Sequence, residues 1–373
     1  MRVAQLANFV GPTSGGMKTT LEALGRGYVA GGVARLLVVP GPEDRVLQTP
    51  AGDVVQLRAP RVGGGYRLIV EPWRVVDALR RFAPTSLEVS DKSTLLPVTR
   101  WARREGVASV LFSHERLDAM LSLRTGLPVR ATPWNRTLVR HHDRVVVTSR
   151  YARDELRAVA NLAATPLHRV PLGVDLATFT PGLGAGPGPG PRAGGPLRLA
   201  HAGRLSREKS PHLAVATALA LHRRGVPLRL DVYGDGPQRG ELERMADGAP
   251  VRFHGHLAGR DRLAARLAEA DVALSVCPGE TFGLSVLEAL ACGTPVVTAD
   301  EGGARELVDE WSGAWAPAEP EALADAVLRV LARDPEGRRA AARRRAERFP
   351  WTRTVEEMLA LHDLGLSRAA TPA

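Results

Sequence analysis

A stretch of glycine and proline in the middle of the chain most constrains its fold. Residues 180–196 read TPGLGAGPGPGPRAGGP, and no side chain there can build a hydrophobic core. Proline also blocks helix formation and strand pairing. The chain has 373 residues, enough for two domains. We therefore expect a first domain over 1–179, a linker over 180–196, a second domain over 197–345, and a C-terminal helix over 346–373 that crosses back to the first domain.

Short apolar runs alternate with amphipathic stretches on both sides of this linker. Near-continuous apolar strands separated by helices are typical of parallel sheets covered on both faces. The strands expected in the first half are Val3–Ala7, Arg35–Val39, Leu87–Val89, Ser109–Phe112 and Arg144–Thr148. Those expected in the second half are Leu197–Ala202, Leu228–Tyr233, Val251–His254, Val272–Ser275 and Pro295–Thr298. The predicted fold class is α/β, with two Rossmann-like doubly wound parallel-sheet domains facing a central cleft.

Composition narrows the class of protein further. The formal charge of +10 comes almost wholly from arginine, since the lysines are Lys18, Lys92 and Lys209. The sequence has neither zinc-finger spacing nor an aromatic-rich basic motif, so we expect no nucleic acid as partner. No apolar run reaches the roughly 20 residues of a membrane span. Cys277 and Cys292 both lie in apolar segments, which predicts free thiols and a cytoplasmic protein.

The most informative chemistry follows the expected strand at Val272–Ser275. Residues 278–297 read PGETFGLSVLEALACGTPVV, with Glu280 before a helix and Glu288 inside it. Two carboxylates in an apolar segment need partners, because burying an unpaired charge is costly. The two hydroxyls of a ribose are such partners. Gly283 lets a ligand approach the backbone, and the first-turn N–H groups of the helix suit a phosphate.

This segment resembles the glutamate-x-seven-glutamate signature of glycosyltransferase family 4, the retaining GT-B enzymes also called glycosyl transferases group 1. The spacing, the Phe282-Gly283 pair and the Gly-x-Pro-Val-Val exit at 293–297 all agree with it. The loop HAGRLSREKS at 201–210 resembles the family's Gly-Arg-Leu…Glu-Lys-Gly loop, except for Ser210 where glycine is usual. Ser210 followed by Pro211 makes a good helix start, so this departure from the family pattern is tolerable.

The resemblance implies a role for each matching residue. Glu280 would orient the donor sugar, and His114, after the strand Ser109–Phe112, would assist at the reacting centre; these two are the expected catalytic residues. A histidine at a strand end can equally be structural. The implied donor-binding residues are Gly15, Gly16, Arg204, Lys209, Phe282, Gly283, Leu284 and Glu288. Among them, Glu288 would bind the ribose, and the two cations would neutralise the diphosphate.

The implied reaction moves a hexosyl group (mannosyl, glucosyl or GlcNAc) from a UDP- or GDP-sugar to a hydroxyl acceptor, with retention. We expect no metal and no other cofactor, because the chain contains no Asp-x-Asp motif and Arg204 and Lys209 can supply the positive charge. Asp91 and Lys92 are candidate acceptor-binding residues, although Asp91 can equally cap a helix. The amphipathic basic stretch 71–82 fits either an ordinary packed helix or a membrane-surface helix. A lipid-linked acceptor and peripheral membrane contact therefore stay open.

Other interpretations use the same residues. A GT-B nucleotide-sugar epimerase would lack the family-4 segment, and a glycan phosphorylase would need a lysine for pyridoxal phosphate, where Lys209 is the second half's one lysine. A non-catalytic basic binding protein would have no need for Glu280 and Glu288. The Arg-rich stretch at 321–361 is interpreted as a solvated helical tail, without a catalytic role.

Overall fold

The computed structural model describes residues 1–8, 10–11, 15–62, 66–90, 94–114, 131–163, 165–182 and 195–369, with side chains up to residue 364. The chain forms two units. The first holds the described residues up to Leu172 and the C-terminal residues from Trp351, and the second holds 173–350. The boundary between the two units, at residues 172 and 173, thus precedes the glycine- and proline-rich stretch. Val174 already belongs to the second unit, where its N–H group donates to the carbonyl of Phe349. Residues 183–194 of the expected linker lie outside the described residues.

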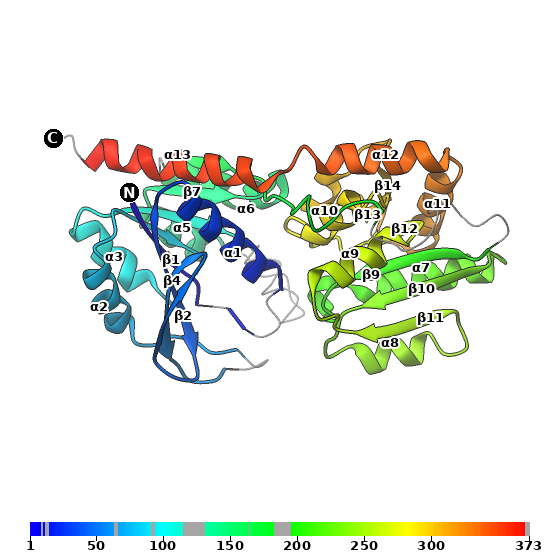
Figure 1. The fold of residues 1–373 in the computed structure, drawn as a ribbon, viewed down its shortest axis with the longest axis horizontal. Helices are drawn as coiled ribbons and strands as arrows, with labels where there is room; N and C mark the ends of the chain where they lie inside the picture. Colours follow the sequence, from blue (N-terminus) through cyan, green and yellow to red (C-terminus); the bar gives the residue numbers. More distant parts are fainter. Residues whose placement is uncertain are drawn as a thin grey trace. The chain divides into compact units, whose positions relative to one another are not determined.

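The first unit is built on an eight-stranded sheet of order β3-β4-β2-β1-β5-β6-β7-β8, parallel except for the pair β3–β4 (Figure 1). Its strands are β1 (Arg2–Leu6), β2 (Ala34–Gly41), β3 (Arg45–Thr49), β4 (Gly52–Arg58), β5 (Ser86–Val89), β6 (Ala108–Ser113), β7 (Arg144–Val147) and β8 (Leu167–Arg169). Its helices are α1 (Gly15–Ala30), α2 (Pro72–Phe82), α3 (Leu96–Arg104), α5 (Thr132–Arg140), α6 (Arg150–Ala163) and α13 (Trp351–Ala369).

The antiparallel hairpin β3–β4 and the strand β8 are absent from the sequence-based prediction. That prediction relied on near-continuous apolar runs, which mark strands covered on both faces. The hairpin lies at the sheet edge, where Val46 is 71% exposed and Leu57 is the one buried residue of the two strands. Its sequence therefore carries little hydrophobic periodicity to detect.

The two faces of the central strands β1 and β5 are covered by different helices. Successive residues of a strand point to opposite faces. Ala4 and Leu87 pack into the core beneath α2 and α3. Their neighbours Gln5 and Glu88 point to the other face, which α1 and α13 cover. The C-terminal helix thereby completes the core of the first unit.

A buried polar network joins α1 and α13 to this face. The Glu88 carboxylate accepts hydrogen bonds from Gln5 (2.8 Å) and from the hydroxyl of Tyr28 in α1 (2.8 Å). It also lies 3.3 Å from Nε2 of His362 in α13, whose Nδ1 is 2.7 Å from the Ser86 hydroxyl. Burial alone would raise the pKa of Glu88, but its partners, His362 first, lower it below the ordinary value. The network therefore keeps a charged carboxylate inside the core.

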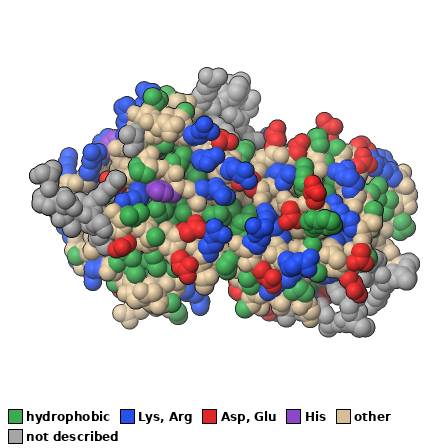
Figure 2. Space-filling view, turned by 90° about the horizontal axis from the view of Figure 1, so that it is seen from above, with side chains coloured by type: hydrophobic (Ala, Val, Ile, Leu, Met, Phe, Trp, Pro, Cys, Tyr) green, Lys and Arg blue, Asp and Glu red, His purple; other side chains and the backbone are tan. Residues whose placement is uncertain are grey.

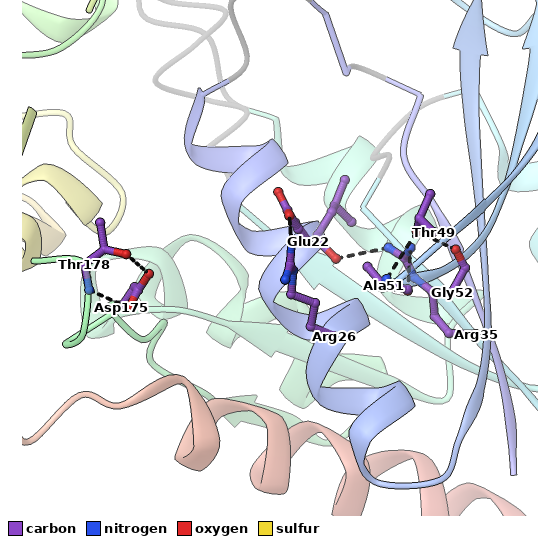
Figure 3. Close-up of polar contacts among 9 residues, drawn as sticks. Glu22, Arg26, Arg35, Thr49, Ala51, Gly52, Asp175 and Thr178 are labelled. Carbon is purple, nitrogen blue, oxygen red and sulfur yellow. Dashed lines mark hydrogen bonds and ion pairs between the residues drawn. The ribbon is translucent and has the colours of Figure 1, made fainter. Parts of the chain in front are cut away.

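Arg35 of β2, the strand beside β1, extends this network to α1 and to the turn between β3 and β4. Its Nε donates to Gln5, and its other nitrogens donate to the backbone carbonyls of Ala51 and Leu21, as Figure 3 shows for Ala51. Burial lowers the pKa of Arg35 to about 10, which still leaves the guanidinium charged at neutral pH. A positive and a negative group thus share one hydrogen-bonded cluster in the core, so neither charge is buried unpaired.

The second unit is built on a six-stranded parallel sheet of order β11-β10-β9-β12-β13-β14. Its strands are β9 (Leu197–Ala202), β10 (Leu228–Tyr233), β11 (Val251–Gly255), β12 (Val272–Ser275), β13 (Val296–Ala299) and β14 (Gly313–Ala316). Its helical segments are η2 (Arg207–Lys209), α7 (Pro211–Arg223), α8 (Arg239–Met245), α9 (Arg260–Ala268), α10 (Leu284–Ala291), η3 (Gly303–Leu307), α11 (Pro320–Leu331) and α12 (Pro335–Ala346). Both units thus confirm the α/β, doubly wound class; β14 is a strand that the sequence-based prediction omitted.

The arginines of α12 are structural, so the interpretation of the Arg-rich stretch as a solvated tail is wrong for this helix. Arg339 donates to the carbonyls of Ala268 (2.7 Å) and Ala270 (3.0 Å) at the end of α9. Arg343 donates to Ala291 (3.0 Å) at the end of α10. The last carbonyl groups of a helix receive no hydrogen bond from an N–H group of the same helix. A cation at this end supplies a donor and also complements the helix dipole. Helix α12 therefore caps the two helices beside it.

We predict that His362→Ala weakens the first unit, because it removes one partner of a buried carboxylate. The expected loss in the free energy of unfolding is about 2–4 kcal/mol. Hydrogen exchange of the α13 amides should accelerate, and calorimetry should show a lower melting temperature for one transition. Glu356→Ala, on the exposed side of the same helix, is the control and should leave both unchanged. An equal effect of the two variants would contradict a stabilising role for the network.

Candidate active site

The candidate site of the second unit lies at the switch point of its sheet. Chain order runs outward from β9 in both directions, to β10 on one side and β12 on the other. In open parallel sheets, ligands bind at the carboxyl ends of the strands where the order reverses. The loop after β9 carries Arg204 and Lys209, and the loop after β12 carries Glu280. The topology therefore brings together residues more than 70 positions apart in the chain.

Glu280 and Lys209 form an ion pair in these loops. The Lys209 Nζ lies 2.7 Å from Oε2 of Glu280, and the two side chains are 40% and 14% exposed. Burial alone would raise the pKa of Glu280, but Lys209 and the backbone N–H groups of Phe282 and Thr281 lower it. Glu280 is therefore an ionised, fixed hydrogen-bond acceptor at neutral pH.

Two glycines fix the loop that carries Glu280. Gly283 has a φ of 101°, a left-handed conformation that favours glycine, immediately before α10. At Gly302 a β-carbon would lie 2.7 Å from the carbonyl oxygen of Pro278, so only glycine permits this approach. The next residue, Gly303, donates its N–H to the carbonyl of Glu280 at 2.6 Å. The segment after β13 therefore supports the Glu280 loop, a contact that the sequence motifs did not indicate.

Helix α10 begins at Leu284, next to this loop. In its first turn the N–H group of Val286 donates to the carbonyl of Gly283, and the N–H groups before it point out of the N-terminus of the helix. Phe282 is buried, with 5% of its surface exposed. The ring of Phe282 is therefore packed inside the unit, while its backbone N–H group is directed to the carboxylate of Glu280.

The loop after β9 ends at Ser210, directly before α7. Ser210 adopts a left-handed conformation with φ 46° and ψ 46°, and its side chain makes no capping hydrogen bond to α7. Its hydroxyl is directed instead to the carbonyl of Arg207, at 3.4 Å. Helix α7 does begin at Pro211, directly after Ser210, as predicted. The serine side chain does not cap it, because this position adopts the left-handed conformation that glycine adopts most easily. Arg204, in the same loop, lies 3.4 Å from Glu208.

Glu288 lies in α10 and is also largely buried, with 14% of its side chain exposed. Oε1 of Glu288 accepts a hydrogen bond from Nη2 of Arg260 at 3.0 Å. Burial raises the pKa of Glu288 to about 7, although Arg260 acts to lower it. Sequence reasoning missed Arg260: it is the first residue of α9, but no motif indicates that it reaches a carboxylate 28 residues away.

The remaining predicted residues belong to the first unit. Gly15 and Gly16 are the first two residues of α1. A β-carbon on Gly15 would meet no described atom within 4 Å, so packing among the described residues does not demand glycine there. His114 follows β6, with Nε2 3.2 Å from the hydroxyl of Ser90 and its ring 4.2 Å from that of Phe112. Asp91 and Lys92 lie outside the described residues.

Metal-ligating side chains do not gather anywhere in the described parts of either unit. No group of three or more histidine, cysteine, aspartate and glutamate residues there has the geometry to hold an ion. Cys277 and Cys292 are buried free thiols rather than a disulfide. The charged residues that the family resemblance implies for the donor are all described in the second unit: Arg204 and Lys209 in the loop after β9, Glu280 in the loop after β12 and Glu288 in α10.

Two family models match the chain. Residues 15–173 match the glycosyl transferase 4-like domain, and residues 196–333 match the glycosyl transferases group 1. A GDP-mannose-dependent alpha-(1-6)-phosphatidylinositol dimannoside mannosyltransferase of Mycobacterium tuberculosis is 42% identical, over 96% of this chain and 95% of that protein. A D-inositol 3-phosphate glycosyltransferase of Saccharomonospora viridis is 36% identical over 60% of this chain and 56% of that protein.

Solved structures share the fold at lower identity. Sucrose-phosphate synthase from Thermosynechococcus elongatus superposes with a TM-score of 0.79 at 22% identity, covering 99% of this chain and all of that one (100%). Anabaena HepE, solved with UDP and glucose, gives a TM-score of 0.74 at 19% identity, covering 97% and 99%. These likenesses confirm the two-domain architecture that the sequence predicted.

We predict that Lys209→Met destabilises the second unit at neutral pH. The pKa of Glu280 is lowered in the folded protein, so its contribution to stability is present above the unfolded pKa and is lost as pH falls through the folded one. Without Lys209, burial raises that pKa and makes the charged form costly. Urea unfolding at pH 7.5 should show a free energy of unfolding lower by about 1–2 kcal/mol. The loss is modest because Lys209 is 40% exposed and solvent screens the ion pair.

The double variant Lys209→Met/Glu280→Gln provides the matched control. Removing both charges leaves no unpaired carboxylate, so most of the lost stability should return. The loss in the single variant should also shrink as the pH is lowered towards about 4.5, where the unfolded-state carboxyl protonates. A deficit that is independent of pH and persists in the double variant would contradict the role of the pair.

Proposed function

The chain belongs to the group 1 glycosyltransferases, glycosyltransferase family 4, and from this premise we propose that it transfers mannose from GDP-mannose to a hydroxyl of a lipid-linked acceptor. The transfer retains the anomeric configuration and requires no metal ion or other cofactor. One observation carries the proposal: two largely buried carboxylates, Glu280 and Glu288, flank the N-terminus of α10, each with its own cation.

The choice of donor follows from the relatives. The Mycobacterium tuberculosis relative, similar over almost its whole length, is named as GDP-mannose-dependent. The UDP in the HepE structure is a weaker guide, because that protein is 19% identical and shares only the fold. GDP-mannose is therefore favoured over a UDP-sugar.

In the proposal, the second unit binds the donor. The N–H groups at the start of α10 and the cations Arg204 and Lys209 face the diphosphate. Glu288 accepts hydrogen bonds from the ribose hydroxyls, and Glu280 accepts them from hydroxyls of the mannose. No described atom lies within 4 Å of a β-carbon placed on Gly15, which suits close approach of a ligand to the start of α1. His114, beside Ser90, assists at the reacting carbon.

The reaction breaks the bond between the anomeric carbon and the phosphate oxygen and forms a bond from that carbon to the acceptor oxygen. Negative charge develops on the departing diphosphate, and Arg204 and Lys209 are positioned to stabilise it without a metal. The acceptor attacks from the face that the phosphate leaves, and the departing oxygen receives the acceptor's proton. Glu280 does not act as nucleophile in this scheme, because Lys209 and two backbone N–H groups already engage its oxygens.

The exposed surface of helix α2 favours a lipid-linked acceptor over a soluble one. Val75, Ala78 and Leu79 pack it against the sheet, while Trp73 is 60% exposed. The exposed arginines of α2 and of its neighbour α3 are Arg80, Arg81, Arg100, Arg103 and Arg104. An exposed tryptophan next to arginines suits the surface of an anionic membrane. None of the described helices is long and apolar enough to cross a bilayer, so the proposed contact is peripheral.

The alternatives receive less support. An epimerase or a phosphorylase would not account for similarity to a mannosyltransferase over nearly the whole chain. For a binder of nucleic acid, the excess of arginine would need to form a basic surface. Figure 2 instead shows acidic side chains among the basic ones across the visible face, and many described arginines are engaged by carboxylates or carbonyls.

We predict that the protein binds GDP-mannose and transfers mannose to phosphatidylinositol mannoside, whereas Glu288→Ala loses donor affinity while remaining folded. Calorimetry should give at least tenfold weaker binding for the variant, in line with about 1.5–3 kcal/mol for hydrogen bonds to a charged group. NMR of the product should show an α-linkage, as in the donor, and EDTA should leave the rate unchanged. Tighter binding of UDP-glucose than of GDP-mannose would overturn the choice of donor.

We predict that the protein co-sediments with vesicles containing phosphatidylglycerol at low salt and is released at about 0.5 M NaCl, because salt screens the attraction. Trp73→Ala/Arg80→Gln/Arg81→Gln should weaken binding by about 1 kcal/mol per arginine, roughly fivefold each. Arg26→Gln/Arg353→Gln removes the same charge from exposed positions on α1 and α13 and should not weaken it. Equal binding to neutral vesicles would argue against an electrostatic contact.

A further inference from the structure

Arg260 stands apart from the residues that the sequence motifs identify, yet it contacts one of them. It is the first residue of α9, and its Nη2 donates to Oε1 of Glu288 in α10 at 3.0 Å. The guanidinium also lies over the ring of Phe179, 4.9 Å from its centroid. A charged hydrogen bond on one side and an aromatic ring on the other restrict where this side chain can lie.

A third group, the carboxylate of Asp175, lies near Arg260. Burial raises the pKa of Asp175, but hydrogen bonds from Thr178 and Ala177 lower it below its ordinary value. The nearby charge of Arg260 also lowers this pKa, by a smaller amount. Figure 3 shows Asp175 held by Thr178, in the same segment as Phe179. Arg260 therefore has a carboxylate near it from the 173–182 segment and another from α10.

The chemistry of Glu288 depends on its charge. An ionised carboxylate accepts hydrogen bonds at both oxygens. In a protonated carboxyl one oxygen carries a hydrogen, which would lie against the hydrogen of a hydroxyl that donates to it. Arg260 engages Oε1, and no side chain or N–H group among the described residues donates to Oε2. The geometry therefore leaves Oε2 as the acceptor that a diol can reach, with Oε1 anchored.

Other charged groups near α10 do not take the place of Arg260. Cys292, on the same helix, has its pKa raised to about 12 by burial and by Glu288, so it is neutral at physiological pH. From α12, Arg339 and Arg343 are directed to backbone carbonyls at the ends of α9 and α10. Among the described ionisable groups, Arg260 is the one whose charge acts on Glu288.

We propose that Arg260 is a positioning residue for donor binding, which favours the ionised form of Glu288 and orients its carboxylate to accept the ribose hydroxyls of the nucleotide. This inference rests on the proposed function and adds to it a residue outside the recognised motifs. Arg260 acts through Glu288 and need not touch the donor itself.

The proposal gives donor binding a dependence on pH. Burial raises the pKa of Glu288 to about 7 even with Arg260 in place, so affinity should be full above that pH and should fall below it. Removing Arg260 removes the charge that opposes this rise. The decline in affinity should then begin at a higher pH. At a pH below the pKa of Glu288, each unit by which this pKa rises should weaken binding about tenfold.

The test is calorimetric titration with GDP between pH 6 and 9, on the wild type, Arg260→Met and Arg260→Lys. At pH 7, Arg260→Met should bind GDP about tenfold more weakly, and the deficit should narrow towards pH 9. Arg260→Lys should recover part of the affinity, because it keeps the charge. Arg266→Met removes a charge from the exposed side of the same helix, paired with Glu269 at 3.0 Å, and should match the wild type.

Glu288→Gln separates failure of this inference from failure of the proposed function. If Glu288→Gln binds GDP as tightly as the wild type, the ribose role of Glu288 is wrong, and the proposed site with it. If Glu288→Gln weakens binding but Arg260→Met retains wild-type affinity and pH profile, only the role of Arg260 is wrong. The double variant should bind no more weakly than Glu288→Gln alone. A flat wild-type profile from pH 6 to 9 would overturn the inference without any variant, so misfolding of Arg260→Met cannot protect it.

Discussion

The second unit depends on the arginines of one helix, α12, which terminate the helices that carry the candidate site. Arg339 donates to carbonyls at the end of α9, and Arg343 donates to the last carbonyl of α10. Arg345 donates in the same way to Glu306 and Leu307 at the end of η3. Buried helix ends need such partners, since their carbonyls find none within the helix. Capping the C-terminal ends thus supports α9 and α10, the helices that carry Arg260 and Glu288 of the candidate site.

The two glutamates of the family signature sit in different electrostatic environments. Glu280 lies in a loop, where Lys209 and backbone N–H groups stabilise its charge and lower its pKa. Glu288 lies within a helix, where one guanidinium opposes the cost of burial and the pKa still rises to about 7. A residue spacing alone does not distinguish these environments. The carboxylate in the loop is a permanent acceptor, whereas the one in the helix is an acceptor whose charge can be lost near physiological pH.

Much of the fold was predictable because it relies on repeated local patterns. The strands β9, β10 and β12 begin and end where the apolar runs predict, since their residues are covered on both faces. The hairpin β3–β4 was not predictable in this way, because at an exposed edge few of its residues need be apolar. Ser210 before Pro211 correctly marked the start of α7, but the left-handed conformation of Ser210 is a property of the folded loop that the sequence does not reveal.

The sequence by itself determined the class of the protein and the identity of its chemical groups. The alternation of strands and helices predicts two α/β units, and the spacing of Glu280 and Glu288 around a helix start identifies the family. Only the tertiary structure decided which charges meet: Lys209 with Glu280, Arg260 with Glu288, and His362 with a buried Glu88 274 residues away. The physical reason is that a motif records neighbours along the chain, whereas the pKa and orientation of a buried carboxylate are determined by neighbours in space.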